Sequence, residues 1–535
     1  MTSRARTETL VAMVAAAGIV QLPTAAIVVA LPTIHVEFDA SLAELQWAVT
    51  AFYIPFSALL IAAGRLADIF GRRLMLYLGC ALFAGGSAIA AVAPDAQLLI
   101  LGIALSGVGG ALLMPASMSL LTNVFTGARR GFAIGMWGAA TELVSGIGVL
   151  VGGVLTGQLS WRWIFAVNIL FAILIVILAW RGTPESRDPN APRRVDIPGA
   201  VLTASGLTAI TLALIQGATW GWGSTAIVGL FAAGIASFVV FAIVERRTEN
   251  PLIDFDFFKH RNFTGATTTI FVIDFSFGAM LFFLPEYFQD ILGYTPTETG
   301  ALLLPLTGLM VIASPLGGKI AASVGPRPPI VVGLTAMLIS IYWISTLDLS
   351  TTYSDLWAPT AIMGFGIGLA LTPMNLAAMN AVSRDHAGAA SGILVTLSGL
   401  GATLGVAVTG AIFGELQTQR TVDLVGDQGV TVGRETALQL EGVLSGTPGA
   451  QHALDKLAGS DTSGIQHAVS EAFVSALGTS LKISAALVLV GIVLAVALLR
   501  KSEPADATPI AELAPSITPR PAPHGTVLEP EPVPA

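Results

Sequence analysis

Two acidic residues lie inside apolar stretches of the sequence, and their chemistry is informative. Glu142 lies within residues 131–161 and Asp274 within residues 262–285, each without another charged residue in its stretch. A charged side chain near the middle of a membrane helix costs about 2.5–3.5 kcal/mol, and burial favours the neutral acid. Such a group can bind a proton and release it when water or a cation arrives. Alternatively, each acid is hydrogen-bonded to neighbouring Ser, Thr or backbone groups.

Other polar and aromatic residues in apolar stretches are candidates for lining a substrate cavity. They are Gln21, Phe271, Asn375 and Asn380. The sequence has no nucleotide-binding Gly-Lys-Ser/Thr loop and no His within an apolar stretch, so we expect no cofactor and no metal. No nucleophile and base stand out, so no enzyme is expected. The net charge of −8 argues against nucleic acid as a partner.

The composition indicates that these residues are held by membrane helices. Of the 535 residues, 54% are hydrophobic and 11% are charged, whereas soluble domains carry about 25% charged residues. The mean hydropathy is +0.77. Long apolar stretches, each near the roughly 20 residues that a bilayer requires, recur along the chain. Residues 197–244 are too long for one crossing and are divided by Trp220–Gly223. We therefore predict an all-α integral membrane protein with 14 transmembrane helices.

The basic residues predict the orientation, because Lys and Arg are retained in the cytoplasm. With the N-terminus inside, 21 of the 26 basic residues fall on the inner side and five on the outer side. Four of those five lie in or beside one long outer loop, where the rule is weak. The prediction is a multi-pass protein of the inner (plasma) membrane with both termini in the cytoplasm.

An internal repeat divides the chain. Gly64–Arg73 resembles Gly318–Arg327 at an offset of 254 residues, and Ser145–Gly148 resembles Ser398–Gly401 at an offset of 253. Parallel repeats of this kind are common in secondary transporters. We predict an N-terminal six-helix half (1–182), two inserted helices (195–247) and a C-terminal six-helix half (260–501). The C-terminal half includes an outer loop at 415–475, and the Pro-rich tail at 502–535 is expected to be disordered.

Several motifs together resemble the 14-helix drug:proton antiporters of the major facilitator superfamily. The most specific one is Gly64–Arg73, which is similar to the signature of the loop between the second and third helices. The others are Ala30–Pro32, Leu112–Ser117, Trp161–Phe165, Glu249–Leu252, Gln289–Tyr294 and Ala387–Gly392. The chain departs from the family pattern at Pro23, where an acid is usual, at Ile103, where an Arg is usual, and at Val149, where a Pro is usual.

The resemblance implies the major facilitator fold and the export of lipophilic or cationic small molecules in exchange for protons by alternating access. It also implies a conformational gate formed by Gly64, Arg65, Asp68, Gly71, Arg72 and Arg73, in which Asp68 caps a helix of the opposite half. Since the usual acid is replaced by Pro23, we hypothesise that Asp274 or Glu142 carries the proton.

The expected partners are a small-molecule substrate, protons and the lipid bilayer, with the chain acting as a monomer. Two alternatives stay open. The same fold could export an endogenous lipid or metabolite, or the chain could be a membrane sensor or scaffold that does not transport.

Overall fold

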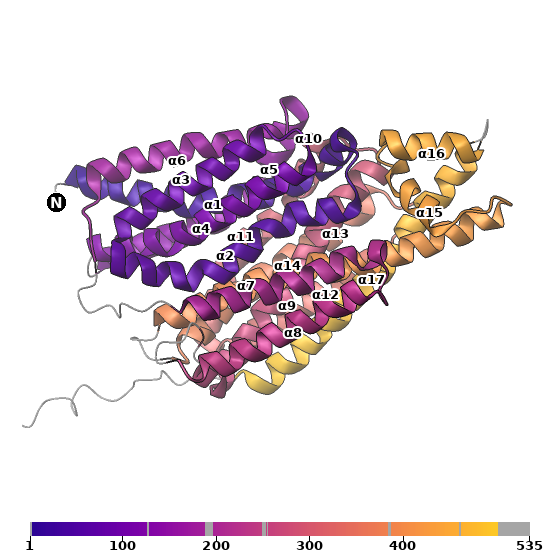
Figure 1. Ribbon diagram of the computed structural model, residues 1–535. Helices are drawn as coiled ribbons and strands as arrows, with labels where there is room; N and C mark the ends of the chain where they lie inside the picture. Colours follow the sequence, from indigo (N-terminus) through magenta and orange to yellow (C-terminus); the bar gives the residue numbers. More distant parts are fainter. Residues whose placement is uncertain are drawn as a thin grey trace, which may run out of the picture.

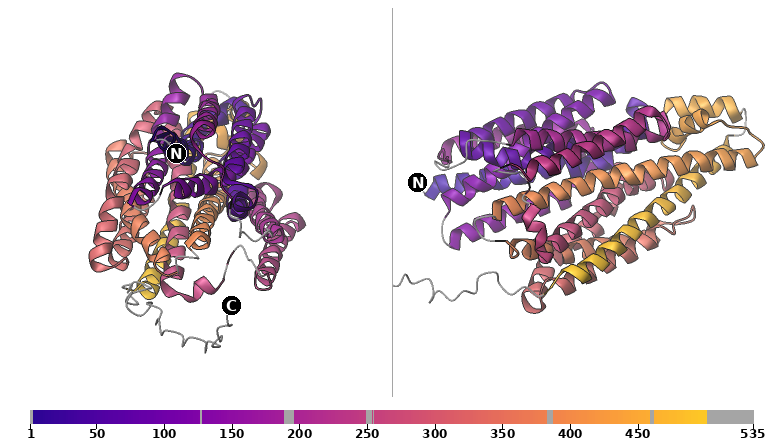
Figure 2. Two further views of the ribbon diagram at one scale, coloured as in Figure 1. Left: turned by 90° about the vertical axis from the view of Figure 1, so that its left-hand side faces the viewer. Right: turned by 60° about the horizontal axis from the view of Figure 1, so that its bottom comes forward.

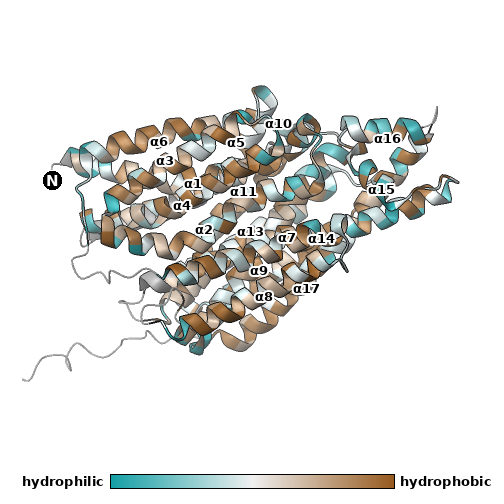
Figure 3. Cartoon of the chain, in the orientation of Figure 1, coloured by the Kyte–Doolittle hydropathy of each residue, from teal (hydrophilic) through white to brown (hydrophobic). Residues whose placement is uncertain are grey.

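The computed structural model describes residues 3–125, 128–187, 196–248, 253, 255–382, 387–458 and 462–500. Within these residues the regular structure is helical, without strands. Figure 1 shows long helices running side by side along one axis, with a small group of short helices at one end. Most residues of the long helices are apolar, and hydrophilic residues gather at the helix ends and on the short helices (Figure 3).

The first eight helices correspond to the N-terminal half and the insert. The helices of the N-terminal half are α1 (Ser3–Phe38), α2 (Leu42–Phe70), α3 (Arg72–Ala91), α4 (Ala96–Val124), α5 (Ala128–Gln158) and α6 (Arg162–Gly182). The insert consists of α7 (Ile197–Trp220) and α8 (Thr225–Glu245). The turn between α7 and α8 contains Gly221 in a positive-φ conformation (φ 83°), which a glycine adopts without strain.

The C-terminal half begins with a short 3-10 helix (Phe255–Lys259), followed by α9 (Arg261–Glu286) and one π-helical turn (Tyr287–Ile291). Its further long helices are α11 (Leu304–Val324), α12 (Arg327–Ile344), α13 (Tyr353–Met379), α14 (Ala387–Asp427) and α17 (Ser463–Leu498). Short α10 (Pro296–Leu302) precedes α11. Between α14 and α17 lie α15 (Arg434–Leu440), a 3-10 turn (Glu441–Val443) and α16 (Pro448–Ala458).

The predicted number of membrane helices agrees with the structure. Within the residues that the structure describes, twelve helices are long and apolar enough to span a membrane, and α2 makes thirteen when its two bent parts are taken as one span. Helix α5 contains a shorter apolar stretch, Leu143–Gln158, but its 31 residues extend over about 46 Å. With α5 as the fourteenth span, the fold is the predicted arrangement of two six-helix halves and a two-helix insert.

The two halves meet along two seams. In one seam α2 packs against α14, and in the other α5 packs against α10 and α11. The repeat relates α2 to α10–α11 and α5 to α14. The α2–α14 seam therefore corresponds to the seam between α10–α11 and α5. Helix α7 contacts both α2 and α14 and therefore lies along the first seam.

The beginning of α1 and the end of α17 lie at the same end of the bundle (Figure 2). We call this the inner end, following the orientation predicted from charge, and the opposite end the outer end. At the outer end, α14 continues to Asp427 and α17 begins at Ser463, well beyond the apolar stretches that end at Gly414 and begin at Ala476. The predicted loop at 415–475 therefore includes two helix ends, and the predicted helix near Glu435–Leu444 is present as α15 and its 3-10 turn.

The segments between α14 and α17 form a cap, which we define as residues 428–458. Its small core is formed by buried side chains of the cap and of the adjoining helix ends, among them Val432, Leu440, Val443, Leu454 and Val469. The predicted tail at 502–535 lies outside the described residues.

Candidate functional site

Asp274 lies on α9 between the two halves. Its side chain is half-buried and packs against α14, where a Cβ on Gly401 would lie 3.3 Å from the Cβ of Asp274. From the N-terminal half, the Tyr53 hydroxyl of α2 lies near enough to Asp274 for an electrostatic interaction, and it also lies near Thr24 of α1. Asp274 thus lies near residues of the N-terminal half as well as in its own half.

Gln21 lies near this group on α1. The Thr24 hydroxyl donates a hydrogen bond to the Gln21 carbonyl oxygen at 2.8 Å, and the Gln21 side chain is half-buried. Gln21 and Thr24 of α1 and Tyr53 of α2 therefore lie in the same part of the bundle as Asp274. Phe271, one helical turn before Asp274, is half-buried, and its ring centroid lies 6.2 Å from that of Phe275.

The positions that depart from the family pattern are apolar neighbours in the structure. Pro23 and Ile103 line the same small space of about 10 Å³, together with Phe52, Phe165 and other side chains, and the Ile103 side chain is 5% exposed. A Pro and an Ile thus pack together where the family usually has an acid and an Arg. Neither position can therefore carry a proton, and a proton-carrying acid has to be another residue of the chain.

Glu142 lies on α5, but its side chain is outside the part that the structure describes. The helix itself packs very closely on α1, since a Cβ on Gly152 would lie 2.6 Å from the Cα of Ala26 and one on Gly148 would lie 2.8 Å from the Cβ of Ala25. Val149, at the third departing position, is buried.

The two asparagine candidates lie toward the end of α13 that leads to the inner side. Asn375 is exposed and donates a hydrogen bond from its amide to the Leu371 carbonyl of its own helix at 3.1 Å. Helix α13 ends at Met379, so Asn380 is the residue that follows it, and it is exposed. In this conformation neither of them joins the group around Asp274.

The predicted gate residues form a compact structure within the N-terminal half. Gly64, Arg65 and Asp68 lie on the last turns of α2, and Arg72 and Arg73 begin α3. Asp68 forms an ion pair with Arg72 at 2.8 Å. Gly71 joins the two helices with a φ angle of 120°, a backbone conformation that residues other than glycine rarely adopt.

The segment after α6 fixes this loop from the side. The Glu185 carboxylate accepts a hydrogen bond from the Arg73 backbone N–H at 3.0 Å, and the Arg73 guanidinium donates to the Thr183 carbonyl at 3.0 Å. A carboxylate at the first N–H groups of a helix is favourable for the helix dipole. In this conformation Asp68 therefore bonds within its own loop and not to the opposite half.

Contacts between the halves lie elsewhere. The Gln289 amide of the π-helical turn donates to the Val29 carbonyl of α1 at 2.9 Å, and the Thr297 hydroxyl of α10 donates to the Gly153 carbonyl of α5 at 3.1 Å. Nearer the middle, the Thr396 hydroxyl lies 3.4 Å from the Ser57 carbonyl. Between described residues, the hydrogen bonds that join the halves thus run from the middle of the bundle to its outer end.

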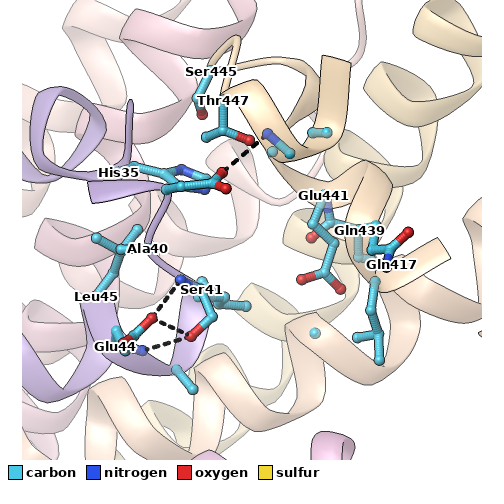
Figure 4. A pocket seen from close by; sticks show the side chains of 18 of the residues that line it. His35, Ala40, Ser41, Glu44, Leu45, Gln417, Gln439, Glu441, Ser445 and Thr447 are labelled. Carbon is cyan, nitrogen blue, oxygen red and sulfur yellow. Dashed lines mark hydrogen bonds between the residues drawn. The ribbon is translucent and has the colours of Figure 1, made fainter. Parts of the chain in front are cut away.

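A pocket of about 630 Å³ lies at the outer end, between the helices and the cap. In Figure 4, Gln417, Gln439 and Glu441 face His35, Ser41 and Glu44 across it. The Glu441 carboxylate accepts a hydrogen bond from the Thr418 hydroxyl at 2.9 Å. Burial nevertheless raises the pKa of Glu441 to about 7, against the lowering effects of Thr418 and Arg434.

The sequence interpretation missed one acidic residue in this pocket. Glu286 follows Pro285, where we expected the ninth apolar stretch to end, but α9 continues through it into the π-helical turn. Its side chain is only 5% exposed, and it lines the pocket. The sequence feature that could have predicted this site is the pair Glu286 and Asp290, which lie about one helical turn apart just after the apolar stretch.

Comparison with known proteins identifies the family. Residues 13–406 match the sequence model of the Major Facilitator Superfamily. The chain belongs to this superfamily. It is 34% identical over 427 residues to the puromycin resistance protein of Streptomyces alboniger, covering 79% of this chain and 84% of that protein. It is also 34% identical over 385 residues to the multidrug efflux pump LfrA of Mycolicibacterium smegmatis, covering 72% and 76% of the two chains.

A relative of similar length is the tetracenomycin C resistance and export protein of Streptomyces glaucescens, which is 28% identical over 94% of this chain and 93% of that protein. Among solved structures, an inward-facing bacterial homologue of the lysosomal transporter Spinster matches with a TM-score of 0.61 and 16% identity, over 94% of this chain and 100% of the other. The structural match supports the fold alone. The predicted resemblance to a family of drug exporters is confirmed by the named relatives.

As a member of the major facilitator superfamily, the chain has the two-half architecture in which a path between the halves opens to one side at a time. Its described residues include an acid, Asp274, on α9 near Tyr53 of the other half. Their contacts place a closed seam and a capped acidic pocket toward the outer end. These features suit the movement of a small molecule and of a proton between the two halves.

Proposed function

We propose that this protein is a multidrug-type exporter that moves lipophilic or cationic small molecules out of the cell in exchange for protons. Its membership of the superfamily and the named functions of its relatives support this activity. In this proposal it acts as a transporter and not as an enzyme, and as a monomer in the plasma membrane with both termini in the cytoplasm.

The position of Asp274 carries the proposal for the proton. The acid is half-buried against Gly401 of its own half and lies near Tyr53 of the other half. Protonation of Asp274 changes the charge at a point where both halves meet, and this change alters the relative stability of conformations that bury or hydrate the acid. Asp274 is therefore the first candidate for the proton carrier, and Glu142 of α5 is the second.

Asp68 and the loop around it supply the conformational part of the proposal. In the present conformation the Asp68–Arg72 ion pair stays within one half. We propose that the inner end closes in the other state of the cycle, and that Asp68 then meets a helix N-terminus of the opposite half. The second copy of the repeat has Ala322 at the corresponding position, so the gate is asymmetric.

The test of proton coupling is transport driven by an imposed pH gradient in proteoliposomes. For the variant Asp274→Asn we expect proton-driven export to fall at least about 100-fold, as general acid–base groups typically contribute that much to a proton-transfer step. Glu142→Gln is measured beside it. The control is Asp455→Asn, which makes the same chemical change at an exposed residue of α16.

Full gradient-driven transport by both Asp274→Asn and Glu142→Gln would contradict the assignment of the proton carrier. Absence of flux for every compound of a broad panel in the unmodified protein would instead contradict the transporter itself and favour a scaffold. Lipid and metabolite profiles of a deletion strain, compared with its drug susceptibilities, separate drug export from export of an endogenous compound.

A further inference from the structure

The pocket at the outer end contains more acidic groups than its surroundings neutralise. Six carboxylates line it, from five helical elements and the segment between α1 and α2, together with one lysine, Lys456, and the histidines His35 and His452; the carboxylates are Asp39, Glu44, Glu286, Asp290, Glu435 and Glu441. None of the five ion pairs in the described part of the chain involves one of these six. A nearby guanidinium, that of Arg434, is already paired with Glu415 at 2.6 Å.

Neutral donors satisfy several of these carboxylates only in part. The Ser445 hydroxyl donates a hydrogen bond to the Asp290 carboxylate at 2.6 Å. The Gly449 N–H donates to the Asp39 carboxylate at 3.4 Å. Glu44 is held by the N-cap residue Ser41 at the start of α2. These contacts orient the carboxylates but leave their negative charge uncompensated.

Two polar side chains in the wall of the pocket are buried and have an oxygen without a hydrogen-bond partner. They are Glu286 of α9, with Oε1 unpaired at 5% exposure, and Gln46 of α2, with Oε1 unpaired at 2% exposure. Gln46 belongs to the N-terminal half and Glu286 to the C-terminal half. Buried acceptors of this kind are normally satisfied, so two of them lining one cavity indicate that a donor or a positive charge is accommodated there.

The rest of the wall is suited to an organic molecule. The side chains of Phe413 and Phe473 are buried at the pocket, with Leu45, Ile215 and Leu444 beside them. Aromatic faces attract cations, and a cavity of about 630 Å³ is in the range of small-molecule sites. An inorganic ion would leave most of this volume and its apolar wall unused.

We propose that the pocket beneath the cap is a binding site for a monovalent organic cation, held by Glu286 and Asp290 from one half and Gln46 from the other. The site lies where the halves are joined at the outer end. A bound cation therefore bridges two groups that must separate when this end opens. Its position on an export route rests on the proposed function, but the binding itself does not.

The test uses two probes of the same shape and opposite charge, tetraphenylphosphonium and tetraphenylborate, on the full-length protein in detergent without a pH gradient. The reporter is a cysteine at Gln439, which is exposed and lines the pocket. The native Cys80 is buried and contributes little background to labelling. We expect tetraphenylphosphonium to protect Gln439→Cys from a thiol reagent, and tetraphenylborate not to do so.

In the same reporter protein, Glu286→Gln should weaken protection by about tenfold or more, the effect of losing one charge-assisted contact. Asp290→Asn should act in the same direction. The matched control is Glu471→Gln, which removes an exposed carboxylate of α17 at the same end of the molecule and should leave protection unchanged.

Equal protection by tetraphenylborate, or unchanged protection in both acidic variants, would overturn the proposal. If Asp274→Asn abolishes transport but protection persists, then the outer site and the central proton site are separate, as proposed. If no transport is found for the unmodified protein and protection is still selective for the cation, the proposed cation site is supported and the proposed exporter function is contradicted.

Discussion

The two ends of the bundle are built differently. At the outer end, side chains of one half bond directly to the backbone of the other, as Gln289 does to Val29 and Thr297 to Gly153, and the cap covers the helix ends. At the inner end, the charged loop is bonded within one half, through Asp68 to Arg72 and through Arg73 to Glu185. Hydrogen bonds thus join the two halves at the outer end, whereas the ionic contacts of the inner loop stay within the N-terminal half.

This difference indicates which contacts must change during transport. The outer seam combines close backbone packing with neutral hydrogen bonds, which are lost together when the helices separate. The inner loop has ionic groups, such as Asp68 and Arg72, that can change partners. Opening of the outer end therefore requires several contacts to break at once, whereas closing of the inner end requires existing charges to be redirected.

The largest effect is expected from a side chain placed in the outer seam. A Cβ on Gly153 would meet the Pro296 carbonyl and lie 3.1 Å from the Cα of Gly300. Gly153→Val should therefore destabilise this closed seam by about 1–3 kcal/mol, as overpacking does, and lower the unfolding temperature of the purified protein. The control is Gly308→Val on α11, where a Cβ meets nothing within 4 Å. Equal effects of both variants would show that the seam is not tightly packed.

The second prediction concerns pH and the cap. Since burial raises the pKa of Glu441 from 4.5 to about 7, the folded cap binds this proton more tightly than the unfolded chain does. The contribution to stability is complete below pH 4.5 and is lost as the pH rises through about 7, with a ceiling of about 3 kcal/mol.

Hydrogen exchange of α15 between pH 4 and pH 8, corrected for the intrinsic pH dependence of exchange, checks this prediction. Protection of α15 should decrease with rising pH in the unmodified protein, and Glu441→Gln should remove most of the dependence. The inner-end helix α3, measured in the same experiment, is the internal reference. A pH dependence that persists unchanged in Glu441→Gln would contradict the assignment to this carboxyl group.

A smaller effect is expected from loss of one bond across the seam. Gln289→Leu removes the amide that donates to Val29, at a cost of about 0.5–1.5 kcal/mol to the closed outer end. Nitroxide labels at the exposed positions Pro94 and Ser350 would report a broader or longer distance between the halves. Gln419→Leu is the control, because Gln419 bonds to Glu415 within one helix. A distance distribution that does not change in Gln289→Leu would show that the bond between Gln289 and Val29 does not hold the outer end closed.

The smallest structural effect is expected at the inner end. Asp68→Asn breaks an ion pair that is partly exposed, so the stability of this conformation should change by less than about 1 kcal/mol. Labels at Leu74 and Val324, both exposed, should keep their distance distribution. The transport rate should nevertheless fall, since the proposed gate forms in the other state. A variant that transports at the normal rate would show that Asp68 only stabilises its own loop.

Much of the architecture could be predicted because membrane helices follow simple rules. Apolar stretches of sufficient length gave the number of spans, and the repeat around Gly64 and Gly318 gave the two halves. The site was predicted less completely. Asp274 was proposed because an acid within an apolar stretch is conspicuous, whereas Glu286, which lines the outer pocket, was missed because it directly follows such a stretch. Whether a residue at a helix end is buried depends on what covers it.

By itself, the sequence determined the membrane fold, the number of its helices and the family, because these follow from hydrophobic length, internal repetition and motifs that are local in the chain. The tertiary structure alone decided which ends of the helices touch, that the cap encloses an acidic pocket, and that Pro23 and Ile103 pack together as apolar neighbours. These properties depend on segments far apart in the chain, such as Asp39 and Gly449, that meet only when the two halves and the cap are assembled.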